Sequence, residues 1–408
     1  MIDLKEISKI GIGTYKMFIN NIEHIESLSF AISKGINLID TASNYQFGDS
    51  EKLIGKLISQ IDREKVFVIS KAGYIQGNDI LTFSKFLNNK GTIKISERFY
   101  YSIEKQFLQL QIQASLKKLN TDYLDCFLIH NPEHYFDVPN ENQSKIYAHL
   151  IESLFHLETL VEKGMIRYYG ISSNRLPKKG IDLTEILNKN DFPNFKLIQF
   201  PYNLIENDAS LKNYDDKSLI ELCQKRDIKT ISNRPLNTTY NNKVLRLADY
   251  SNEISKIDDF QEEELFNVFI QRIQDQLTKF GENSRPEDFT PIKYFIDNRK
   301  NIANPEAVSR AVEGHLIPFI NQLQFDDTND LKKIIRKLQY YWSLYSKASI
   351  TQRASNLKEE LITKGVFNKE DKRDISLMAC ENYLNSGIDH VLVGLRKKEY
   401  VEKLLSLV

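Results

Sequence analysis

Short apolar runs alternate with longer amphipathic segments along most of the chain. Eight runs are rich in Ile, Val, Leu and Phe, are too short for helices and show no strict polar alternation. Such runs are typical of parallel strands that are covered on both faces. We therefore predict strands at 9–14, 36–40, 66–70, 123–129, 167–171, 196–200, 228–231 and 390–393.

Most of these runs are followed by a segment with apolar residues at helical spacing. The clearest helices are predicted at 21–34, 50–61, 103–119 and 151–163, and a last one from about Glu399. Eight strand–helix units indicate the α/β class and a (β/α)8 TIM barrel. A doubly wound open sheet is the alternative, but the Gly-rich turn GxGxxG does not follow the first strand.

One interval, 237–372, breaks this alternation. It is polar, charged and patterned for helices, most clearly at 261–280, and Asn304 with Pro305 is typical of a helix start. It is also far longer than an ordinary connection between elements. We therefore predict a barrel from 1–236 and 373–408, with a large helical insertion at 237–372 between strands 7 and 8.

The charge balance and the cysteines limit the expected partners and compartment. The 408 residues include 55 Lys and Arg and 55 Asp and Glu, so the formal net charge is zero. A protein that binds nucleic acid or an anionic membrane is expected to have a basic face instead. No apolar run is long enough to span a membrane. Cys126, Cys223 and Cys380 form no CxxC pair or Cys/His cluster. We therefore expect no nucleic acid, no membrane, no thiol–metal site and a reducing cytoplasm.

Polar residues gather directly after the predicted strands. In a TIM barrel the C-terminal ends of the strands form the catalytic face. The polar residues and glycine that follow these strands are Asp40, Thr41, Tyr45, Lys71, His130, Ser172, Ser173, Asn174, Gln199, Tyr202, Asn203, Asn233, Arg234, Gly394 and Arg396. We expect them on one rim of the barrel.

The segments around these residues resemble the aldo-keto reductase family. The family's signature is matched by GINLIDTASNYQFGDSEKLIGKLI, and its lysine and histidine by VFVISK and DCFLIHNP. Its cofactor-binding segments resemble GIGTY, YYGISSN, LIQFPYN and VLVGLRKKEYVEKLL. The resemblance covers about 1–236 and 373–408. It implies an NAD(P)H-dependent oxidoreductase that reduces an aldehyde or ketone, or oxidises the alcohol, and the catalytic residues Asp40, Tyr45, Lys71 and His130.

These four residue types also suit the chemistry of carbonyl reduction. Tyr45 is expected to be the general acid, but a tyrosine with its ordinary pKa of about 10 is a poor acid unless a cation stabilises its phenolate. Lys71 can be that cation, Asp40 can hold Lys71, and His130 can orient the carbonyl. Taken singly, each could have a merely structural role. A zinc site is not expected, because His130 and His134 have no third ligand nearby.

The resemblance also implies a set of cofactor-binding residues. These are Gly13, Thr14, Tyr15, Ser172, Ser173, Asn174, Gln199, Asn233, Arg234, Pro235, Leu236, Gly394 and Arg396. Ser172, Ser173 and Gln199 are expected at the nicotinamide carboxamide, and Arg396 at an adenosine 2′-phosphate, so NADP(H) is expected rather than NAD(H). Asn233 stands about where the family often has an aromatic residue that stacks on the nicotinamide.

The function and the role of the insertion have alternatives. The same barrel could be a non-catalytic, cofactor-binding regulatory or assembly protein, or a lyase or isomerase, but four catalytic groups together favour an oxidoreductase acting on a small-molecule carbonyl or alcohol. The chain ends at Val408 after the last predicted helix, so we expect no C-terminal loop over the pocket. Because 237–372 leaves from the C-terminal end of a strand, we expect it to be a lid. A surface for a protein partner or self-association is the alternative.

Overall fold

The computed structural model describes residues 1–188, 191–240, 243–279, 284–323, 325 and 328–408. The chain divides into two compact units. Unit 1 comprises Met1–Thr238 and Ala379–Val408, and unit 2 comprises Thr239–Met378.

Unit 1 contains a closed barrel, in which eight parallel strands are found among the described residues. The strands are β1 (Ile10–Gly13), β2 (Leu38–Asp40), β3 (Phe67–Ala72), β7 (Leu124–His130), β8 (Ile166–Ser172), β9 (Phe195–Pro201), β10 (Lys229–Asn233) and β13 (His390–Val393). The last strand closes the barrel by pairing with β1 and with β10. All eight predicted strands are present, so the (β/α)8 prediction is confirmed.

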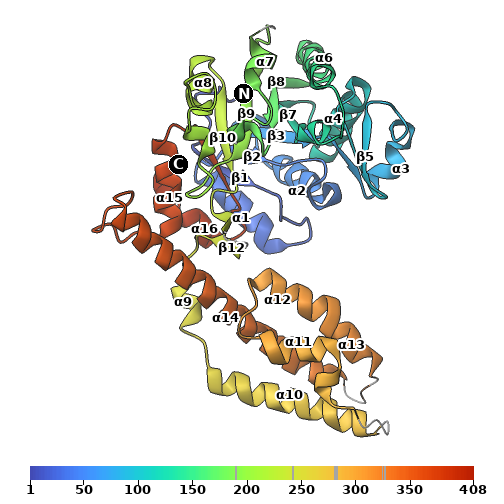
Figure 1. The fold of residues 1–408 in the computed structure, drawn as a ribbon, viewed down its shortest axis with the longest axis vertical. Helices are drawn as coiled ribbons and strands as arrows, with labels where there is room; N and C mark the ends of the chain where they lie inside the picture. Colours follow the sequence, from blue (N-terminus) through green and yellow to red (C-terminus); the bar gives the residue numbers. More distant parts are fainter. Residues whose placement is uncertain (189–190, 241–242, 280–283, 324, 326–327) are drawn as a thin grey trace. The chain divides into compact units, whose positions relative to one another are not determined.

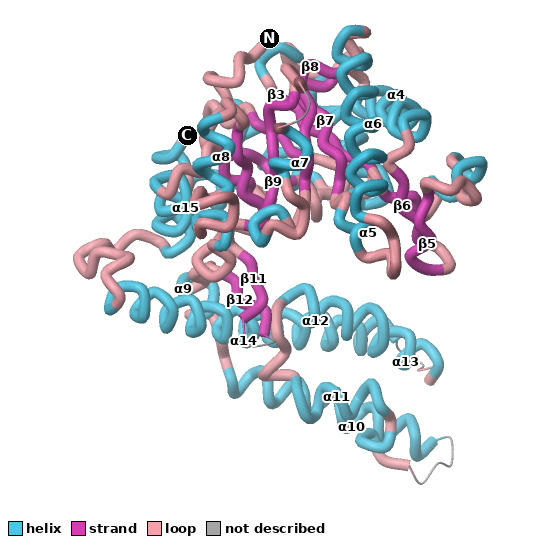
Figure 2. Tube along the Cα trace, turned by 45° about the horizontal axis from the view of Figure 1, so that its top comes forward, coloured by secondary structure: helices cyan, strands magenta, loops and turns pink. Residues whose placement is uncertain are grey.

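Helices surround the barrel strands (Figures 1 and 2). The main ones are α1 (Ile22–Ser33), α2 (Asp49–Ile58), α4 (Lys105–Leu119), α6 (Gln143–Glu162), α7 (Leu183–Leu187), α8 (Leu219–Lys225), α15 (Ile375–Asn385) and α16 (Lys398–Glu402). Helix α6 begins well before the predicted start at Ile151, because Asn142 caps it by accepting a hydrogen bond from the Ser144 amide. Ile146 and Leu150 extend the buried apolar face of α6 into its first two turns, and the predicted start at Ile151 missed them.

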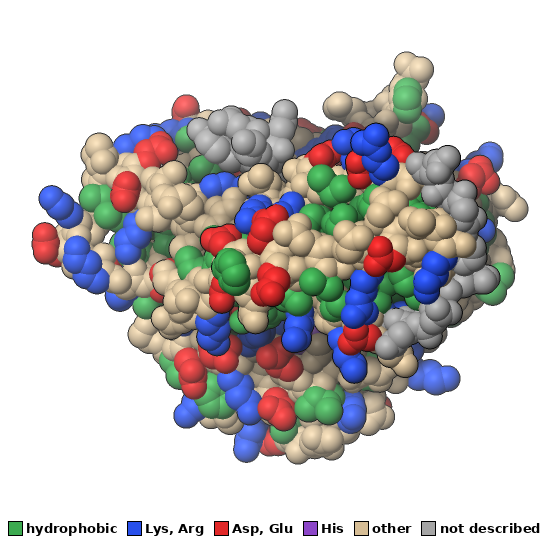
Figure 3. Space-filling model, turned by 90° about the horizontal axis from the view of Figure 1, so that it is seen from below, with side chains coloured by type: hydrophobic (Ala, Val, Ile, Leu, Met, Phe, Trp, Pro, Cys, Tyr) green, Lys and Arg blue, Asp and Glu red, His purple; other side chains and the backbone are tan. Residues whose placement is uncertain are grey.

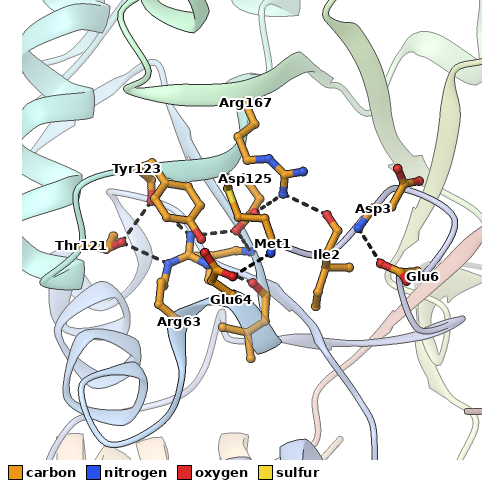
Figure 4. A network of polar contacts seen from close by, with 12 residues as sticks. Met1, Ile2, Asp3, Glu6, Arg63, Glu64, Thr121, Tyr123, Asp125 and Arg167 are labelled. Carbon is orange, nitrogen blue, oxygen red and sulfur yellow. Dashed lines mark hydrogen bonds and ion pairs between the residues drawn. The ribbon is translucent and has the colours of Figure 1, made fainter.

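The N-terminal ends of the strands are closed by packed side chains and a buried ionic network. Ile2 and Leu4 pack against the apolar cluster that fills the barrel interior. Figure 4 shows the adjoining polar contacts, in which the buried Asp125 carboxylate accepts hydrogen bonds from Arg63 and Arg167, both at 2.7 Å. Arg167 also donates to the Ile2 carbonyl at 2.9 Å. These contacts tie the N-terminal segment across this end, which leaves the opposite rim for chemistry.

A three-stranded antiparallel sheet follows β3, and the sequence pattern did not predict it. Its strands are β4 (Tyr74–Gln76), β5 (Thr92–Ser96) and β6 (Phe99–Ser102), in the order β4-β6-β5. A short helix, α3 (Asp79–Thr82), lies between β4 and β5 along the chain. The strands are brief and mix polar with apolar residues, so their pattern is weak. Because β4 starts just after the C-terminal end of β3, this sheet begins at the catalytic rim.

Unit 2 is mainly helical and has a core of its own. Its helices are α9 (Ser251–Ile254), α10 (Asp259–Lys279), α11 (Thr290–Asn298), α12 (Pro305–Ala311), α13 (Ile317–Gln322) and α14 (Thr328–Thr363). Asn304 caps α12 by accepting from the Ala307 amide at 2.8 Å, as predicted. In the core, the rings of Phe295 and Trp342 stack with centroids 4.4 Å apart. Phe280, in the predicted helix 261–280, lies outside the described residues.

The prediction of helix is wrong at the start of the insertion. There β11 (Asn237–Tyr240) and β12 (Lys243–Arg246) form a two-stranded sheet. Two successive threonines in β11 and a valine in β12 favour extended backbone, because β-branched side chains fit a strand better than a helix. The polar composition of this stretch concealed that preference.

The surface carries charges of both signs. On the face drawn in Figure 3, Lys and Arg side chains are interspersed with Asp and Glu side chains over the described residues. No helix in the described part of the chain has the length and apolar character needed to cross a membrane. Within the same described ranges, no three His, Cys, Asp or Glu side chains are grouped as possible metal ligands.

Candidate active site

Four polar side chains from three neighbouring strands meet at the C-terminal rim of the barrel. Asp40 is the last residue of β2, Lys71 is the next-to-last residue of β3, and His130 is the last residue of β7. Tyr45 begins the 3₁₀ turn Tyr45–Gly48 that follows β2. These strands are consecutive in the barrel, so the parallel register brings the four predicted residues together.

The Lys71 ammonium group is at the centre of the cluster and is fully buried. Its Nζ donates hydrogen bonds to Asp40 Oδ2 at 2.7 Å, to the Thr41 carbonyl at 2.8 Å and to the Tyr45 hydroxyl at 3.3 Å. Three acceptors match the three N–H bonds of an ammonium group. Burial raises the pKa of Asp40 and lowers the pKa of Lys71, and their mutual attraction opposes both shifts.

Tyr45 carries a hydroxyl that stays protonated at neutral pH. Desolvation, followed by the negative charge of Asp40, raises the pKa of Tyr45 well above its ordinary value. The Tyr45 ring makes edge contacts with Tyr15, at 5.2 Å between centroids, and with His130, at 6.0 Å. The phenol is therefore a proton donor held between an ammonium group and an imidazole.

The turn after Tyr45 has an uncommon left-handed backbone. Gln46 (φ 48°, ψ 39°) and Phe47 (φ 55°, ψ 35°) are both left-handed, and Gly48 follows with φ 91°. Each such non-glycine residue costs on the order of 1 kcal/mol. Gln46 Nε2 donates to the Tyr15 carbonyl at 2.7 Å, which holds the turn. No glycine marks the first two positions, so this turn could not be recognised from the residue pattern.

His130 is held in its neutral form. Burial, followed by the positive charge of Lys71, keeps the pKa of His130 well below its ordinary value. Its Nδ1 is buried and has no hydrogen-bond partner among the residues that the structure describes. A neutral imidazole can donate a hydrogen bond to a carbonyl oxygen without adding a charge.

An aromatic and amide cluster flanks His130, and sequence reasoning missed it. Tyr74, the first residue of β4, contacts His130 edge-on with ring centroids 5.0 Å apart. The Tyr74 hydroxyl accepts from Asn131 Nδ2 at 2.6 Å and lies 3.1 Å from His134 Nε2. His134, considered above only as a possible zinc ligand, is therefore part of this cluster. The only sign of this cluster that the sequence offered is a second histidine four residues after His130.

The residues predicted at the nicotinamide carboxamide are bonded to one another and to Asp40. Gln199, in β9, donates from Nε2 to Asp40 Oδ1 at 2.7 Å. Its Oε1 accepts from Ser172 Oγ at 3.0 Å and from Asn233 Nδ2 at 3.4 Å. Ser173 donates its amide to the Gln199 carbonyl at 2.9 Å. The Gln199 side chain therefore uses its oxygen and one of its two N–H donors within the protein.

The remaining predicted cofactor residues lie on the other arc of the rim. Gly13 ends β1, Thr14 donates from its amide and its hydroxyl to the Asp40 carbonyl, both at 3.0 Å, and Tyr15 is exposed. The other members follow β8, β10 and β13 and are Asn174, Arg234, Pro235, Leu236, Gly394 and Arg396. The strands β8, β9, β10, β13 and β1 are consecutive around the barrel. The predicted cofactor residues thus form one continuous arc, and the four catalytic candidates the other.

Two loops of the cofactor arc are fixed by specific contacts. The buried Tyr383 of α15 donates its hydroxyl to the Pro235 carbonyl at 2.9 Å. Arg234 has a left-handed backbone (φ 51°) and donates to Asn174 Oδ1 at 3.2 Å. These contacts join the loop after β10 to α15 and to the loop after β8.

The basic turn after β13 lies beside α1. Burial and then the charge of Arg396 lower the pKa of His24 in α1. Lys397 forms an ion pair with Glu23 at 3.6 Å, and Lys398 with Glu26 at 3.0 Å. Both lysines are therefore neutralised by carboxylates of α1.

Comparisons with known proteins identify the family of this chain. The sequence model of the Aldo/keto reductase family matches residues 9–289. NADH-specific methylglyoxal reductase of Escherichia coli (strain K12) is 25% identical over 233 residues, which are 54% of this chain and 61% of that protein. Aldo-keto reductase YhdN of Bacillus subtilis (strain 168) is 27% identical over 208 residues, which are 49% of this chain and 52% of that protein. The chain therefore spans less than two thirds of the length of these relatives.

Solved structures include an aldo/keto reductase from Klebsiella pneumoniae in complex with NADP and acetate. It aligns with a TM-score of 0.37 and 23% sequence identity, and the alignment covers 65% of this chain and 73% of that chain.

Proposed function

The chain belongs to the aldo/keto reductase family, and we propose that it is an NAD(P)H-dependent oxidoreductase that reduces an aldehyde or ketone, or oxidises the corresponding alcohol. The observation that carries this proposal is the buried Lys71 ammonium group, which donates to both Asp40 and the Tyr45 hydroxyl. A buried ion pair is costly to maintain, and here it is directed at a group that can transfer a proton.

In the proposed mechanism, each of the four residues has its own role. His130, neutral at pH 7, donates a hydrogen bond to the substrate carbonyl oxygen and orients it. Tyr45 donates its hydroxyl proton to that oxygen as the carbon is reduced. Lys71 stabilises the phenolate that remains, and Asp40 balances the charge of Lys71. In the oxidation direction the same groups take up the proton from the alcohol.

The bound dinucleotide would supply or accept the hydride, since no side chain can do so. The residues of the cofactor arc fit such a group, because Asn233 Oδ1 is a buried acceptor without a partner among the described residues. We propose that the loops after β1, β8, β10 and β13 hold the dinucleotide. The Klebsiella structure contains NADP and the Escherichia coli relative is NADH-specific, so these two proteins differ in cofactor.

We propose NADP(H) as the preferred cofactor, with Arg396 at the 2′-phosphate. The neighbouring Lys397 and Lys398 are paired with Glu23 and Glu26, so the preference rests on Arg396. We also propose a reducing cytoplasm as the compartment, supported by three cysteines that are all buried free thiols.

Tyr45→Phe tests the proposed function, because it removes the proton donor and keeps the ring. We expect dinucleotide binding to stay within about twofold of wild type, while carbonyl reduction falls by about 10²–10⁴. The measurements are equilibrium binding of NADPH and NADH, and dinucleotide oxidation with aldehydes, ketones, sugars and keto acids. A Tyr294→Phe variant is the control, since it makes the same change at an exposed tyrosine of α11 in unit 2. Equal turnover in Tyr45→Phe and wild type would contradict the proposal.

A further inference from the structure

The His130 ring is held by packing rather than by hydrogen bonds. Among the described residues, neither nitrogen of its imidazole has a hydrogen-bond partner. Two tyrosine rings make edge contacts with it instead. Tyr45 lies 6.0 Å away between centroids, with 79° between the planes, and Tyr74 lies 5.0 Å away, with 78° between the planes. The outer side-chain torsion of histidine has a broad energy well, so these neighbouring rings set the angle of the imidazole.

The hydroxyl of Tyr74 is held from two sides. It accepts a hydrogen bond from Asn131 Nδ2 at 2.6 Å and lies 3.1 Å from His134 Nε2. Because Asn131 is the donor in the first contact, the Tyr74 O–H is left to donate to His134 Nε2, as it can when that nitrogen carries no proton. Burial lowers the pKa of His134 and favours this neutral form. The hydroxyl is therefore used both as acceptor and as donor.

The ring of Tyr74 is held by the sheet β4-β6-β5. It stacks on Phe99 of β6, with centroids 5.2 Å apart and 15° between the planes, and contacts Tyr101 of the same strand edge-on at 5.5 Å. Tyr74 and Tyr101 are paired directly in the β4–β6 ladder. The Tyr101 ring packs so closely on Gly73 that a side chain at Gly73 would clash with it. The position of the Tyr74 ring is therefore set by a sheet that lies outside the barrel.

We infer that Tyr74 is a positioning residue for His130, and that its hydrogen bond with His134 locks it in place. The inference rests on the proposed function, in which His130 orients the substrate carbonyl. Tyr74 then fixes the angle at which the imidazole meets the carbonyl oxygen, and the sheet β4-β6-β5 serves the active site through this one ring. A misplacement of about 1 Å can lower turnover about 100-fold, so the effect of Tyr74 belongs mainly in kcat.

The first test compares the kinetics of Tyr74→Leu and Tyr74→Phe. Tyr74→Leu removes the ring, so we expect kcat to fall by about 10–100-fold while dinucleotide affinity stays within about twofold of wild type. Tyr74→Phe keeps the ring and should retain kcat within about fivefold of wild type. A higher KM with unchanged kcat in Tyr74→Leu would mean that Tyr74 only contributes substrate binding, and would overturn the inference.

The second test observes the His130 ring directly and needs neither substrate nor turnover. Crystal structures of the wild-type protein and of Tyr74→Phe should show one His130 conformer. The structure of Tyr74→Leu should show the imidazole turned, or spread over more than one orientation, because the ring that confined it is gone. An unchanged single conformer of His130 in Tyr74→Leu would contradict the positioning role.

The third test addresses the lock between Tyr74 and His134. Tyr74→Phe and His134→Leu each remove the same hydrogen bond, so the double variant should turn over no more slowly than the slower single variant. His156→Leu is the control, because His156 lies in α6, where Thr159 of the same helix is its hydrogen-bond partner. It should turn over as wild type does. Losses that multiply in the double variant would refute the lock.

The two proposals fail in different ways. If the wild-type protein reduces no carbonyl, the proposed function fails, and the crystal structures still decide whether Tyr74 sets the position of His130. If the wild-type protein is active but Tyr74→Leu keeps its kcat and its His130 conformer, only the role of Tyr74 is wrong.

Discussion

Lys71→Met replaces a fully buried ammonium group with an apolar side chain of similar length. In the native protein Lys71 Nζ serves three acceptors, of which Asp40 Oδ2 and the Thr41 carbonyl are buried with it. The substitution leaves Asp40 as a buried carboxylate whose remaining side-chain partner among the described residues is Gln199. Removing one member of a buried ion pair costs about 3–5 kcal/mol of unfolding free energy. We expect that loss near pH 7.

The same variant should show a characteristic pH dependence. Without Lys71, burial raises the folded-state pKa of Asp40 above the unfolded value of about 4, opposed only by the hydrogen bond from Gln199. Between those two values the folded state binds more protons than the unfolded state, so stability falls as pH rises. The stability deficit of Lys71→Met should therefore be larger near pH 8 than near pH 5.

Urea unfolding at both pH values and dinucleotide oxidation kinetics check these expectations. Lys71→Met/Asp40→Asn removes the stranded charge, so the double variant should be more stable than Lys71→Met at pH 8. Turnover should fall by about 10²–10⁴ in both variants, because the Tyr45 phenolate loses its cation. If the two substitutions destabilise additively, or if the deficit does not depend on pH, the buried-pair reasoning is refuted.

Two further predictions concern the cofactor and unit 2. Arg396→Ala should weaken NADPH binding by about 1.5–3 kcal/mol, the worth of a charge-assisted hydrogen bond, and leave NADH affinity nearly unchanged in equilibrium titrations; equal losses for both cofactors would assign Arg396 to the shared part of the dinucleotide or to structure. Replacing 237–372, which is expected to be a lid, with a short loop should preserve dinucleotide binding and abolish discrimination among carbonyl substrates. A folded deletion variant with the parent's substrate profile would instead favour a role in partner binding.

The barrel was predictable because its strands are buried on both faces. Each appears as a short apolar run, and the residue after the run identifies the rim, which is how Asp40, Lys71 and His130 were found. The sheet β4-β6-β5 and the pair β11–β12 escaped prediction because short, partly polar strands are stabilised by partners rather than by pattern.

Hydrogen bonds between distant side chains were also beyond the sequence. Gln199 donates to Asp40 across 159 positions of the chain, and the direction of that bond follows from the Lys71–Asp40 pair. The left-handed turn at Gln46 likewise depends on its contact with the Tyr15 carbonyl. Such contacts are set by the tertiary arrangement and leave no periodic signal.

The position of unit 2 between β10 and β13 has a consequence for folding during synthesis. The strand β13 pairs with β1 on one side and β10 on the other, so the barrel cannot close until β13 has been made. Translation proceeds at roughly 5–20 residues per second, so the segment from β10 to β13 takes on the order of ten seconds to synthesise. Throughout that time β1 and β10 are open edges with unpaired N–H and C=O groups, the features that invite pairing with other chains. A chaperone that shields these two edges would therefore have its effect before β13 emerges, and would be dispensable afterwards.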